Sequence, residues 1–589
     1  MAIELVGRSA VRPIKSASGE IILTDVTSSL ADANPGPTRW GAFGHPAFTI
    51  IWSASVISNV GIAMFDTASG WFMTNLSADP LVVSLVQVAT SLPLFLFTLP
   101  AGALTDIVDP RRLLFVVGIG VALVSVLFAV LVSLHVATPN ALLITTFLLG
   151  IGGALSAPAW VSISPLLVPR RDLGQAIAAN TTGYNLSRAA GPALGGLIIA
   201  YLGIAAPFWI YGVSNIVVLA ALLWWREPEK ASDSLPAERL LSAIRTGMRH
   251  AKNNLHLRAT LARAIAFFPF ASAYWALLPL VARAQMTQGP EFYGLLLGSI
   301  GVGAIGGSLL LHRLKKKLGA DRLVAAASLG TALSLVLLGF AHDPATALVA
   351  CFIAGVTWTL ILSTLYVSAQ VALPDWVRGR GLGIFLTVIF GASTIGSALW
   401  GHIAGMQGLS IAHYIAAGGA VLAIPLTWRW KLLTGLSVDL APSLHWREPR
   451  VAFEVPLNAG PVLVSIIYHI KPEDQIAFLT AMEEVGRERK RDGAYAWRIF
   501  EDFTTEGKFV ELFLIESWLE LLHQRERVTG ADRMLEDRIR SLLVASPRIR
   551  HWIAAKRNRQ SRLQRATARL RAAGEAATEA AHMAAGGEV

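Results

Sequence analysis

The sequence predicts an all-α polytopic membrane protein that continues into a smaller α+β domain. The chain is 54% hydrophobic, only 15% of its residues are charged, and its mean hydropathy is +0.54. A soluble protein would carry about 25% charged residues. The deficit is concentrated in the first three quarters of the chain, so we expect the membrane part to be N-terminal and the water-exposed part to be C-terminal.

Twelve apolar segments are long enough to cross the core of a bilayer, which takes about 20 residues of helix. They lie near 46–74, 81–104, 113–134, 140–166, 176–202, 207–226, 260–284, 291–312, 323–342, 345–372, 382–406 and 410–432.

Lysine and arginine gather in alternate loops between these segments, which places those loops and both chain termini in the cytoplasm. We therefore attribute the net charge of +11 to basic cytoplasmic loops that orient the protein in the membrane, and not to nucleic-acid binding. Residues 1–45 are polar and lack the apolar core of a signal peptide, so we expect a cytoplasmic N-terminal segment. The single Cys351 leaves no disulfide or Cys-based metal site within one chain. We expect no metal and no cofactor.

The long polar loop 227–259 divides the spans into two groups of six, 46–226 and 260–432. An internal repeat supports this division. An offset of 205 residues maps the following pairs onto each other: Pro169 and Pro374, Gly191 and Gly396, Gly196 and Gly401, Gly102 and Gly307. Such a repeat predicts two similar six-helix bundles with a substrate site between them.

The loop between the second and third spans carries a recognisable pattern. It reads Gly102-Ala-Leu-Thr-Asp106-Ile-Val-Asp-Pro-Arg111-Arg112. This pattern resembles the signature loop of the major facilitator superfamily of transporters. The resemblance implies the major facilitator fold, alternating access, and a gating loop in which Asp106 braces the eleventh helix, with Arg378 or Arg380 taking part.

Beyond 432 the composition becomes that of a soluble protein. Residues 433–460 are predicted to be a linker and 554–589 a basic tail, either an amphipathic helix on the membrane surface or a solvated segment. Between them, 461–553 reads as strand, helix, two strands, helix and strand. That order suggests a ferredoxin-like sandwich.

A second resemblance lies in Glu516-Ser-Trp518-Leu-Glu520 and Arg527-Val-Thr529-Gly-Ala-Asp532. These residues look like the antibiotic-biosynthesis-monooxygenase-like domain appended to a bacterial subfamily of exporters, which resembles enterobactin and macrolide exporters. Beyond Trp518 the histidines of that pattern are missing. Because the segment has no nucleophile–base pair, metal spacing or phosphate loop, we favour an interaction or sensing module, which could dimerise through its sheet. A cleft lined by Trp497, Trp518 and His523 is the alternative.

Asp66 and Arg188 are the charges most deeply placed within the predicted spans. An ionisable group there is a functional candidate because it is costly to insert. We expect Asp66 to couple transport to protons and to pair with Arg188. The alternatives are a structural or water-exposed acid at position 66, and an Arg188 that extends toward the cytoplasmic surface.

The fifth span contains Gly191-Pro192-Ala-Leu-Gly195-Gly196, which resembles the antiporter signature of the same superfamily. Small residues let helices pack closely, and proline permits a kink. With their counterparts Gly396 and Gly401, we expect these residues to pack helices where the two bundles meet. Ordinary close packing, without any bearing on transport direction, is the alternative.

Several polar or aromatic residues lie within the spans and are candidates for the cavity lining, although helix packing is the commoner use of such residues. They are Asn59, Gln87, Asn215, Tyr274, Trp275, Trp358, Tyr366 and Gln370.

Together these features predict a non-enzymatic, proton-coupled exporter of amphipathic small molecules in the bacterial inner membrane. Its expected partners are the lipid bilayer, the substrate and protons, with no nucleic acid. Two alternatives stay open: an importer, because direction depends on coupling energetics, and a transporter whose C-terminal domain is a ligand sensor or a cofactor-free oxygenase acting on the cargo.

Overall fold

The structure is a computed structural model that describes residues 14–15, 21–22, 41–104, 108–225, 240–433, 443, 446, 451 and 455–554. The chain forms two compact units. The first is helical and comprises Met1–Arg245, His256–Ala372 and Arg378–Gly435. The second comprises Thr246–Leu255, Leu373–Val377 and Leu436–Val589. Near the N-terminus, the two-residue strands β1 (Ile14–Lys15) and β2 (Ile21–Ile22) pair with each other.

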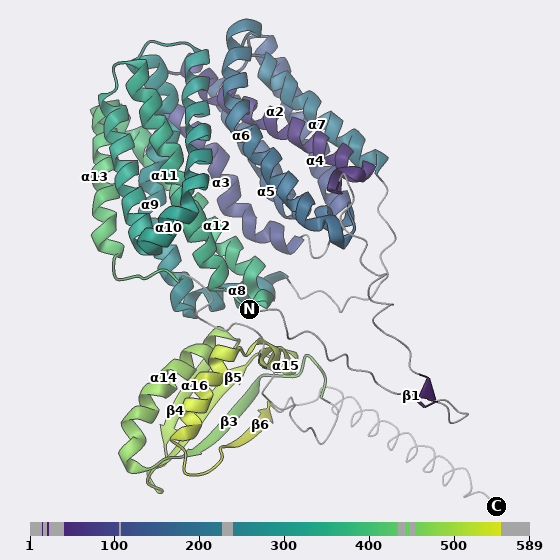
Figure 1. The fold of residues 1–589 in the computed structure, drawn as a ribbon, viewed down its shortest axis with the longest axis vertical. Helices are drawn as coiled ribbons and strands as arrows, with labels where there is room; N and C mark the ends of the chain where they lie inside the picture. Colours follow the sequence, from purple (N-terminus) through teal and green to yellow (C-terminus); the bar gives the residue numbers. More distant parts are fainter. Residues whose placement is uncertain are drawn as a thin grey trace, which may run out of the picture. The chain divides into compact units, whose positions relative to one another are not determined.

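The first half of the helical unit contains six long helices, which Figure 1 shows in purple to blue. Several of them begin at proline, whose fixed φ suits the first turn and whose missing N–H is not needed there. Asp109 and Thr138 accept hydrogen bonds from the first turns of α4 and α5 and so set where these helices start. The helices are α2 (Pro46–Leu76), α3 (Pro80–Leu104), α4 (Pro110–Ser133), α5 (Pro139–Ile163), α6 (Leu173–Leu202) and α7 (Ala206–Trp224).

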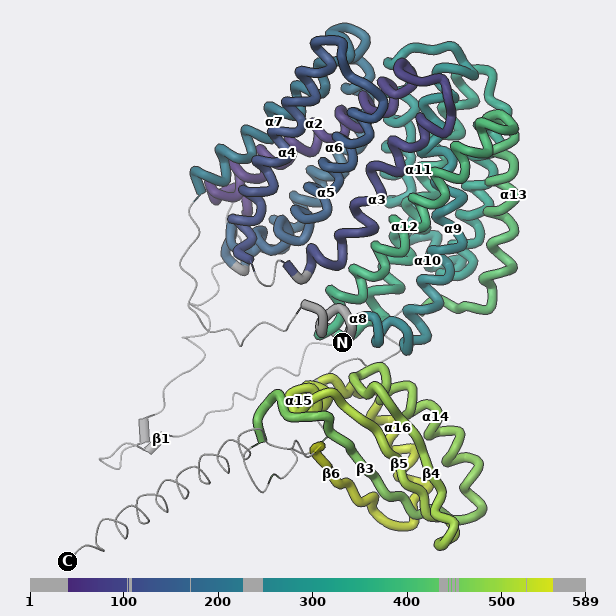
Figure 2. Tube along the Cα trace, turned by 180° about the vertical axis from the view of Figure 1, so that it is seen from behind, coloured from purple at the N-terminus to yellow at the C-terminus, as the bar shows by residue number. Residues whose placement is uncertain are grey.

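The second half follows the short helix α8 (Leu240–Asn253), which lies inside the predicted central loop. The next helix begins before the predicted border at 260. The helices of this half are α9 (Leu255–Leu280), which runs into a π-helical turn at Val281–Gln285, then α10 (Pro290–Phe340), α11 (Pro344–Val371), α12 (Asp375–Gln407) and α13 (Leu409–Thr427). Figure 2 shows this half from behind.

Ten helices in the described part of the chain are long and apolar enough to cross a membrane. Helix α6 is not among them, since it carries Asn180, Asn185, Arg188 and other polar residues. The 51-residue segment α10 consists of two helices that meet at Gly319, and each is long enough to cross the bilayer core. Gly319 interrupts it with a φ of 72°, a left-handed conformation that suits glycine. The predicted number of twelve spans therefore stays a prediction.

The second unit is built on a four-stranded antiparallel sheet in the order β4-β5-β3-β6. The strands are β3 (Val462–His469), β4 (Ala496–Glu501), β5 (Lys508–Ile515) and β6 (Arg548–Ile553). The helices are α14 (Gln475–Arg491), α15 (Trp518–Arg527) and α16 (Gly530–Ser541). The order of strands and helices agrees with the predicted one, except that the last helical stretch is divided in two.

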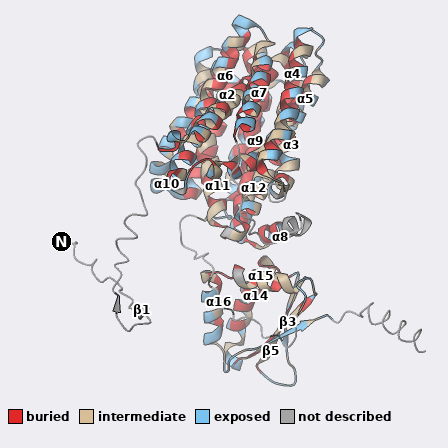
Figure 3. Cartoon of the chain, turned by 90° about the vertical axis from the view of Figure 1, so that its right-hand side faces the viewer, coloured by how far each residue is buried: buried red, intermediate tan, exposed pale blue. Residues whose placement is uncertain are grey.

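The central strands β3 and β5 alternate between buried and half-buried residues, as the sequence pattern predicts for a sheet covered on one face. Val464 of β3 and Phe513 of β5 point inward, where they pack with Phe478 and Met482 of α14. In Figure 3 the buried residues of this unit lie between the sheet and its helices. The other face of the sheet carries no helix of the described chain, which leaves its side chains available for other contacts.

Candidate functional site

Asp66 lies well inside α2, and its side chain is exposed. Its neighbours Phe65, Thr67 and Ala68 are buried. Asn59, two turns earlier, is half-buried on the same helical face. The acid thus occupies an exposed position on α2 between side chains that are packed.

Arg188 is likewise exposed, on α6, and its guanidinium lies 5.9 Å from the ring centroid of Tyr184. It is close enough to act electrostatically on Asp66 of α2 and on Tyr274 of α9. Both groups are described, and no ion pair within 4.0 Å joins them. The expected pairing of Asp66 with Arg188 therefore stays a prediction, while the structure places the two opposite charges in one region without direct contact.

Glycines let α6 approach two helices at once. A methyl group added to Gly191 would lie 2.6 Å from Ala63 Cβ of α2, and one on Gly195 would lie 3.1 Å from Met64 Cα. A methyl group on Gly196 would lie 2.9 Å from Gly294 Cα of α10. The carbonyl oxygen of Pro192, inside α6, also faces Gly294. Helix α6 thus joins the first half of the helical unit to the second.

The repeat-related glycines of α12 make equivalent contacts. A methyl group on Gly396 would lie 2.7 Å from Pro269 Cα of α9, and one on Gly401 would lie 3.1 Å from Leu81 Cα of α3. Gly191 and Gly396 therefore each face the first helix of their own half. Gly196 and Gly401 each face a helix of the opposite half. This shared arrangement is what two structurally similar halves would produce.

Arg283 forms a further link between the halves that the sequence did not indicate. At the end of α9, its guanidinium lies 5.7 Å from the ring centroid of Trp71 in α2. It donates to Thr74 Oγ1 at 3.1 Å and to Asn75 Oδ1. The Trp71 ring also stacks on Tyr293 of α10, with 6.1 Å between centroids. The only available signal was that Arg283 is a basic residue on the side where the loops are otherwise almost uncharged.

Three of the predicted cavity residues form an aromatic cluster from α9 and α11. The ring centroids of Tyr274 and Trp275 are 5.6 Å apart, and that of Trp358 lies 5.8 Å from Trp275 and 6.4 Å from Tyr274. Tyr274 is fully buried, and the two indole rings are half-buried. The Trp358 indole N–H is buried without a hydrogen-bond partner, whereas the Trp275 side chain lies within hydrogen-bonding reach of the Tyr274 hydroxyl.

The other predicted cavity residues are more dispersed. Asn215 is buried and donates to the Tyr211 carbonyl of its own helix at 2.8 Å, so it serves helix packing. Tyr366 packs against Phe385 of α12 with 6.1 Å between ring centroids. Gln87 and Gln370 are half-buried on α3 and α11.

The predicted gating loop is only partly described. Asp106 lies outside the described residues, so its contact with the eleventh helix stays a prediction. Gly102, at the end of α3, is exposed. Arg112 is also exposed, and its backbone N–H donates to Asp109 Oδ1 at 2.8 Å.

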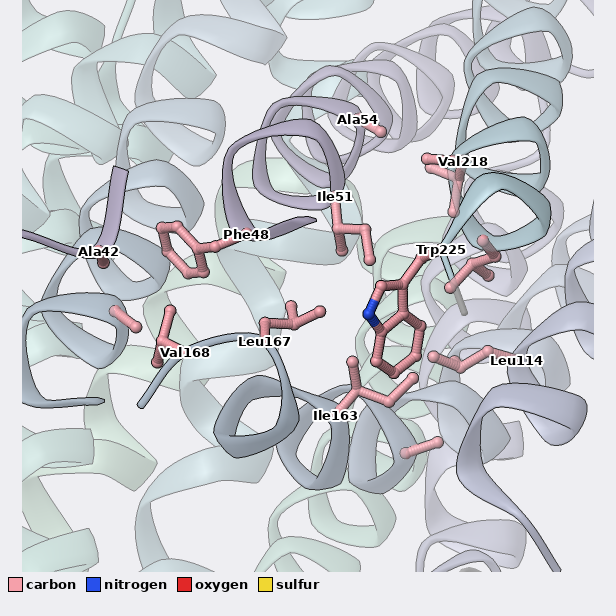
Figure 4. Close-up of a cluster of buried hydrophobic side chains, with 14 of the residues drawn as sticks. Ala42, Phe48, Ile51, Ala54, Leu114, Ile163, Leu167, Val168, Val218 and Trp225 are labelled. Carbon is pink, nitrogen blue, oxygen red and sulfur yellow. The ribbon is translucent and has the colours of Figure 1, made fainter. Parts of the chain in front are cut away.

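Arg111 supports the end of α7. Its Nε and Nη2 donate to the Leu222 carbonyl at 3.1 and 2.9 Å, and the guanidinium lies 5.9 Å from the ring centroid of Trp225. A cation at the C-terminal end of a helix pairs favourably with its last carbonyls. Trp225 itself packs in an apolar cluster with Ile51, Leu114 and other buried side chains (Figure 4). Arg111 thus anchors α7 where this cluster forms.

The second half of the helical unit contains an ion pair that the sequence did not predict. Arg263 is buried in α9, pairs with Asp321 of α10 at 2.8 Å and donates to the Trp430 carbonyl at 2.9 Å. The Asp321 carboxylate also accepts the Leu432 backbone N–H at 3.2 Å. An arginine near the start of an apolar segment was the available signal, but its partner is distant in sequence.

In the second unit, the carboxylate of Glu511 is fully buried at the centre of the sheet. It accepts hydrogen bonds from Tyr468 Oη at 2.7 Å, Trp497 Nε1 at 2.9 Å and Arg489 Nε at 3.3 Å. The Trp497 ring also packs against Gly486 of α14. The protein's own side chains therefore fill this position, and the predicted cleft residue Trp497 is committed to the core. Trp518 and His523 are half-buried on α15. The Nδ1 atom of His523 lies 3.8 Å from Glu520 Oε2.

The second unit also includes the first residues of α12. The guanidinium carbon of Arg527 lies over the Trp376 ring, 4.3 Å from the ring centroid. His250, from the end of α8, meets the same indole edge-on with 5.5 Å between centroids. Arg249 donates to the Gly493 carbonyl and pairs with Glu516 at 2.8 Å. We call this set, which is Arg249, His250, Trp376, Glu516 and Arg527, the docking cluster.

No group of three or more histidine, cysteine, aspartate or glutamate side chains in the described part of the chain is placed to hold a metal ion.

Comparison with known proteins gives the family. A family model described as transmembrane secretion effector matches residues 37–560, which are most of the chain. The chain belongs to the transmembrane secretion effector family of major facilitator transporters. It is accordingly a multi-pass membrane transporter.

Two curated relatives carry names that describe export. The multidrug efflux pump Tap of Mycolicibacterium fortuitum is 25% identical over 408 residues, which cover 67% of this chain and 96% of Tap. The enterobactin exporter EntS of Escherichia coli O1:K1 is 25% identical over 394 residues, which cover 64% of this chain and 90% of EntS.

Solved structures share the helical fold. A POT family transporter in complex with 5-aminolevulinic acid has a TM-score of 0.55 at 13% identity, covering 67% of this chain and 98% of the other. The nucleoside transporter NupG has a TM-score of 0.50 at 11% identity, covering 65% and 99%. At such identities the likeness concerns the fold alone.

The contact of α6 with α10 gives a first prediction. Replacing Gly196 with valine should separate the two helices, because even one added methyl group would collide with backbone atoms of Gly294. Overpacking of this kind costs about 1–3 kcal/mol. Gly196→Val should lower the thermal midpoint of the purified protein. The control is Gly174→Val on the same helix, where an added Cβ meets nothing within 4 Å. Equal midpoints for both variants would contradict the assigned contact.

The docking cluster gives a prediction for pH. Burial, with Arg491 and Arg527 nearby, lowers the pKa of His250 from 6.5 to about 3. The neutral His250 ring is therefore favoured in the folded docking cluster. Its contribution to the stability of the cluster is complete above about pH 6.5 and is lost as the pH falls toward 3. The other groups around it are Asp532, Asn254 and Trp376.

Hydrogen exchange of residues 246–255 in the full protein, corrected for intrinsic rates, should rise between pH 7.5 and pH 5.5. His250→Gln, which stays uncharged, should remove most of this rise. A rise that persists unchanged in the variant would assign the pH dependence to another group.

Proposed function

We propose that this protein is a proton-coupled exporter of amphipathic small molecules in the bacterial inner membrane, with both chain termini in the cytoplasm. The observation that carries the proposal is the exposed carboxylate of Asp66 inside α2, with Arg188 within electrostatic reach but not paired to it. An acid in a membrane span that has no fixed partner is free to exchange a proton. The names of the relatives Tap and EntS support export of small molecules.

Transport would proceed by alternating access of two six-helix bundles. Counting α10 as two spans on either side of Gly319, and adding α6, brings the number of spans to twelve. The contacts of Gly196 with α10 and of Gly401 with α3 would then be the points where the bundles meet, while Gly191 and Gly396 would pack helices within their own bundles. Arg283 with Trp71, and Gly401 with Leu81, would hold the end opposite the basic loops closed.

The gating loop would act at the cytoplasmic end. Arg111 already fixes the end of α7 through the Leu222 carbonyl. Asp106 would brace the start of α12, with Arg378 or Arg380 taking part, when the transporter faces outward. Because Arg111 belongs to the gating loop and binds the end of α7, a movement of α7 would shift the loop.

An importer is the second candidate, because the same scaffold can run in either direction when the coupling gradient is reversed.

The proton role of Asp66 is tested by neutralising it. In everted membrane vesicles energised with a proton gradient, adding a transported macrolide or catechol-type siderophore should partly collapse the gradient. Asp66→Asn should abolish this collapse while the protein stays in the membrane at normal levels. The control is Asp79→Asn, an acid outside the spans that accepts the Leu81 N–H at 2.9 Å. A collapse that survives in Asp66→Asn would move the proton site elsewhere, and uptake in the opposite direction would favour the importer.

We infer that the C-terminal domain has the ferredoxin-like fold and acts as a binding module, not as an enzyme. Its element order and the sheet order β4-β5-β3-β6 support the fold. The side chains of Tyr468, Trp497 and Arg489 around Glu511 leave the centre of the sheet filled, which argues against an oxygenase cleft there. The docking cluster gives the module a role, since it attaches the end of α8 and the start of α12 to the domain.

The open face of the sheet suits a second copy of the chain. Leu512 and Val510 on β5, Ile467 on β3 and Phe500 on β4 point away from the helices. Trp552 of β6 stands opposite Leu463 in the same face. An apolar sheet face of this kind is normally covered, and an identical face offers the same shape and the same polarity.

A charge in the centre of this face should prevent dimerisation. Leu512→Asp should convert dimers of the full-length protein in nanodiscs to monomers, as measured by mass photometry. Ile476→Asp, an exposed apolar residue on α14 away from this face, is the matched control and should leave the dimer intact. A monomeric wild-type protein, or equal dissociation in both variants, would overturn the dimer proposal.

A further inference from the structure

A shallow pocket, open on one side, lies where α9, α13 and the second helix of α10 meet. Its walls are mostly apolar and include Phe267 of α9, Val324 of α10 and Ile424 of α13. Arg263, at one end of the pocket, is its only charged lining residue. The pocket is therefore an apolar groove with a polar end.

The segment that follows α13 is fixed beside this polar end. Arg263 pairs with Asp321 at 2.8 Å and donates to the Trp430 carbonyl at 2.9 Å. Asp321 in turn accepts the Leu432 backbone N–H at 3.2 Å. Because the carboxylate of Asp321 is occupied by these partners, it does not neutralise the other basic side chains nearby.

Three of these basic side chains are exposed around the pocket: Arg322, Arg429 and Lys431. None of them forms an ion pair within 4.0 Å with a described residue. Arg322 lies one turn before Ala325, a residue of the pocket wall, and so shares its helical face. The end of α13 thus presents several cations that have no protein anion to bind.

Aromatic rings hold two of these cations at the end of the helix. The Lys431 ammonium lies 4.4 Å from the ring centroid of Trp428, and the Arg429 guanidinium lies 5.7 Å from that of Trp430. Both tryptophans are exposed. In membrane proteins, exposed tryptophan and basic side chains at a helix end mark the depth of the lipid headgroups.

The outer face of α13 continues from this end as an apolar surface. Val421, Leu422 and Leu426 are all exposed on it. In a multi-pass membrane protein such a face contacts acyl chains, so the pocket opens among lipids and not toward a soluble ligand. Basic pockets between helices on the cytoplasmic side suit the headgroups of anionic lipids.

We propose that this pocket and the basic end of α13 form a binding site for one anionic phospholipid of the cytoplasmic leaflet. Lys431, Arg429 and Arg322 bind the headgroup phosphate, and an acyl chain lies along the apolar groove. The inference goes beyond the proposed transport function and does not depend on proton coupling or on the direction of transport. Its effect is to tie α9, α10 and α13 together at one end through a lipid.

The test counts bound lipids on the full-length protein by native mass spectrometry in detergent, with phosphatidylglycerol and phosphatidylethanolamine as probes. Lys431→Gln should weaken phosphatidylglycerol binding by about 5-fold, and Lys431→Gln with Arg429→Gln by about 25-fold, from the usual strength of one basic residue at an anionic membrane. Binding of the zwitterionic lipid should stay unchanged. Thermal midpoints would confirm that the variants fold.

Arg171→Gln is the matched control, because it removes an exposed charge from a predicted basic loop of the first half. It should leave the binding of both lipids unchanged. Equal losses in Arg171→Gln and Lys431→Gln would reduce the effect to general attraction between basic loops and anionic lipids. That result, equal affinity of the wild-type protein for both lipids, or displacement of phosphatidylglycerol by excess inorganic phosphate would overturn the site.

Discussion

The helical unit depends on three glycines of α6, where the lack of a side chain lets neighbouring helices come close. Gly191 and Gly195 let this helix touch the backbone of α2, and Gly196 lets it touch the backbone of α10. In a membrane, where lipid tails compete equally for apolar contacts, such close backbone packing is a main source of helix association. The same helix carries Arg188, so the element that joins the two halves also places a charge near Asp66. Packing and electrostatics of the candidate site are therefore set by one helix.

Much of this arrangement could be predicted from the sequence because it follows from short-range periodicity. The central strands of the C-terminal domain alternate with a period of two, and the order of strands and helices along 461–553 was predicted. The apolar segments give most of the long helices directly. The glycines of α6 and α12 were selected by the internal repeat, which needs no structure to detect.

The remaining features depend on contacts between distant residues. The sequence contains both Asp66 and Arg188 but not the distance between them. It contains Arg527 and Trp376, yet nothing in the local pattern of either indicates that they stack. Helix α8 was missed because it lies in a polar loop, whereas α6 was predicted as the segment 176–202. Asp106, the residue on which the family pattern depends most, lies outside the described residues.

Helix α12 belongs to both compact units. Its first residues, through Val377, group with the C-terminal domain, and from Arg378 onward it groups with the helical unit. Directly beyond this border the sequence places Gly379, Gly381 and Gly383 within one and a half turns. Glycine stiffens a helix least, so bending is easiest here. Helix α12 therefore carries its most easily bent stretch directly where the grouping of its residues changes, at Val377 and Arg378. Bending of this helix is concentrated in the turns that follow, before the helix reaches its contact with α3 at Gly401.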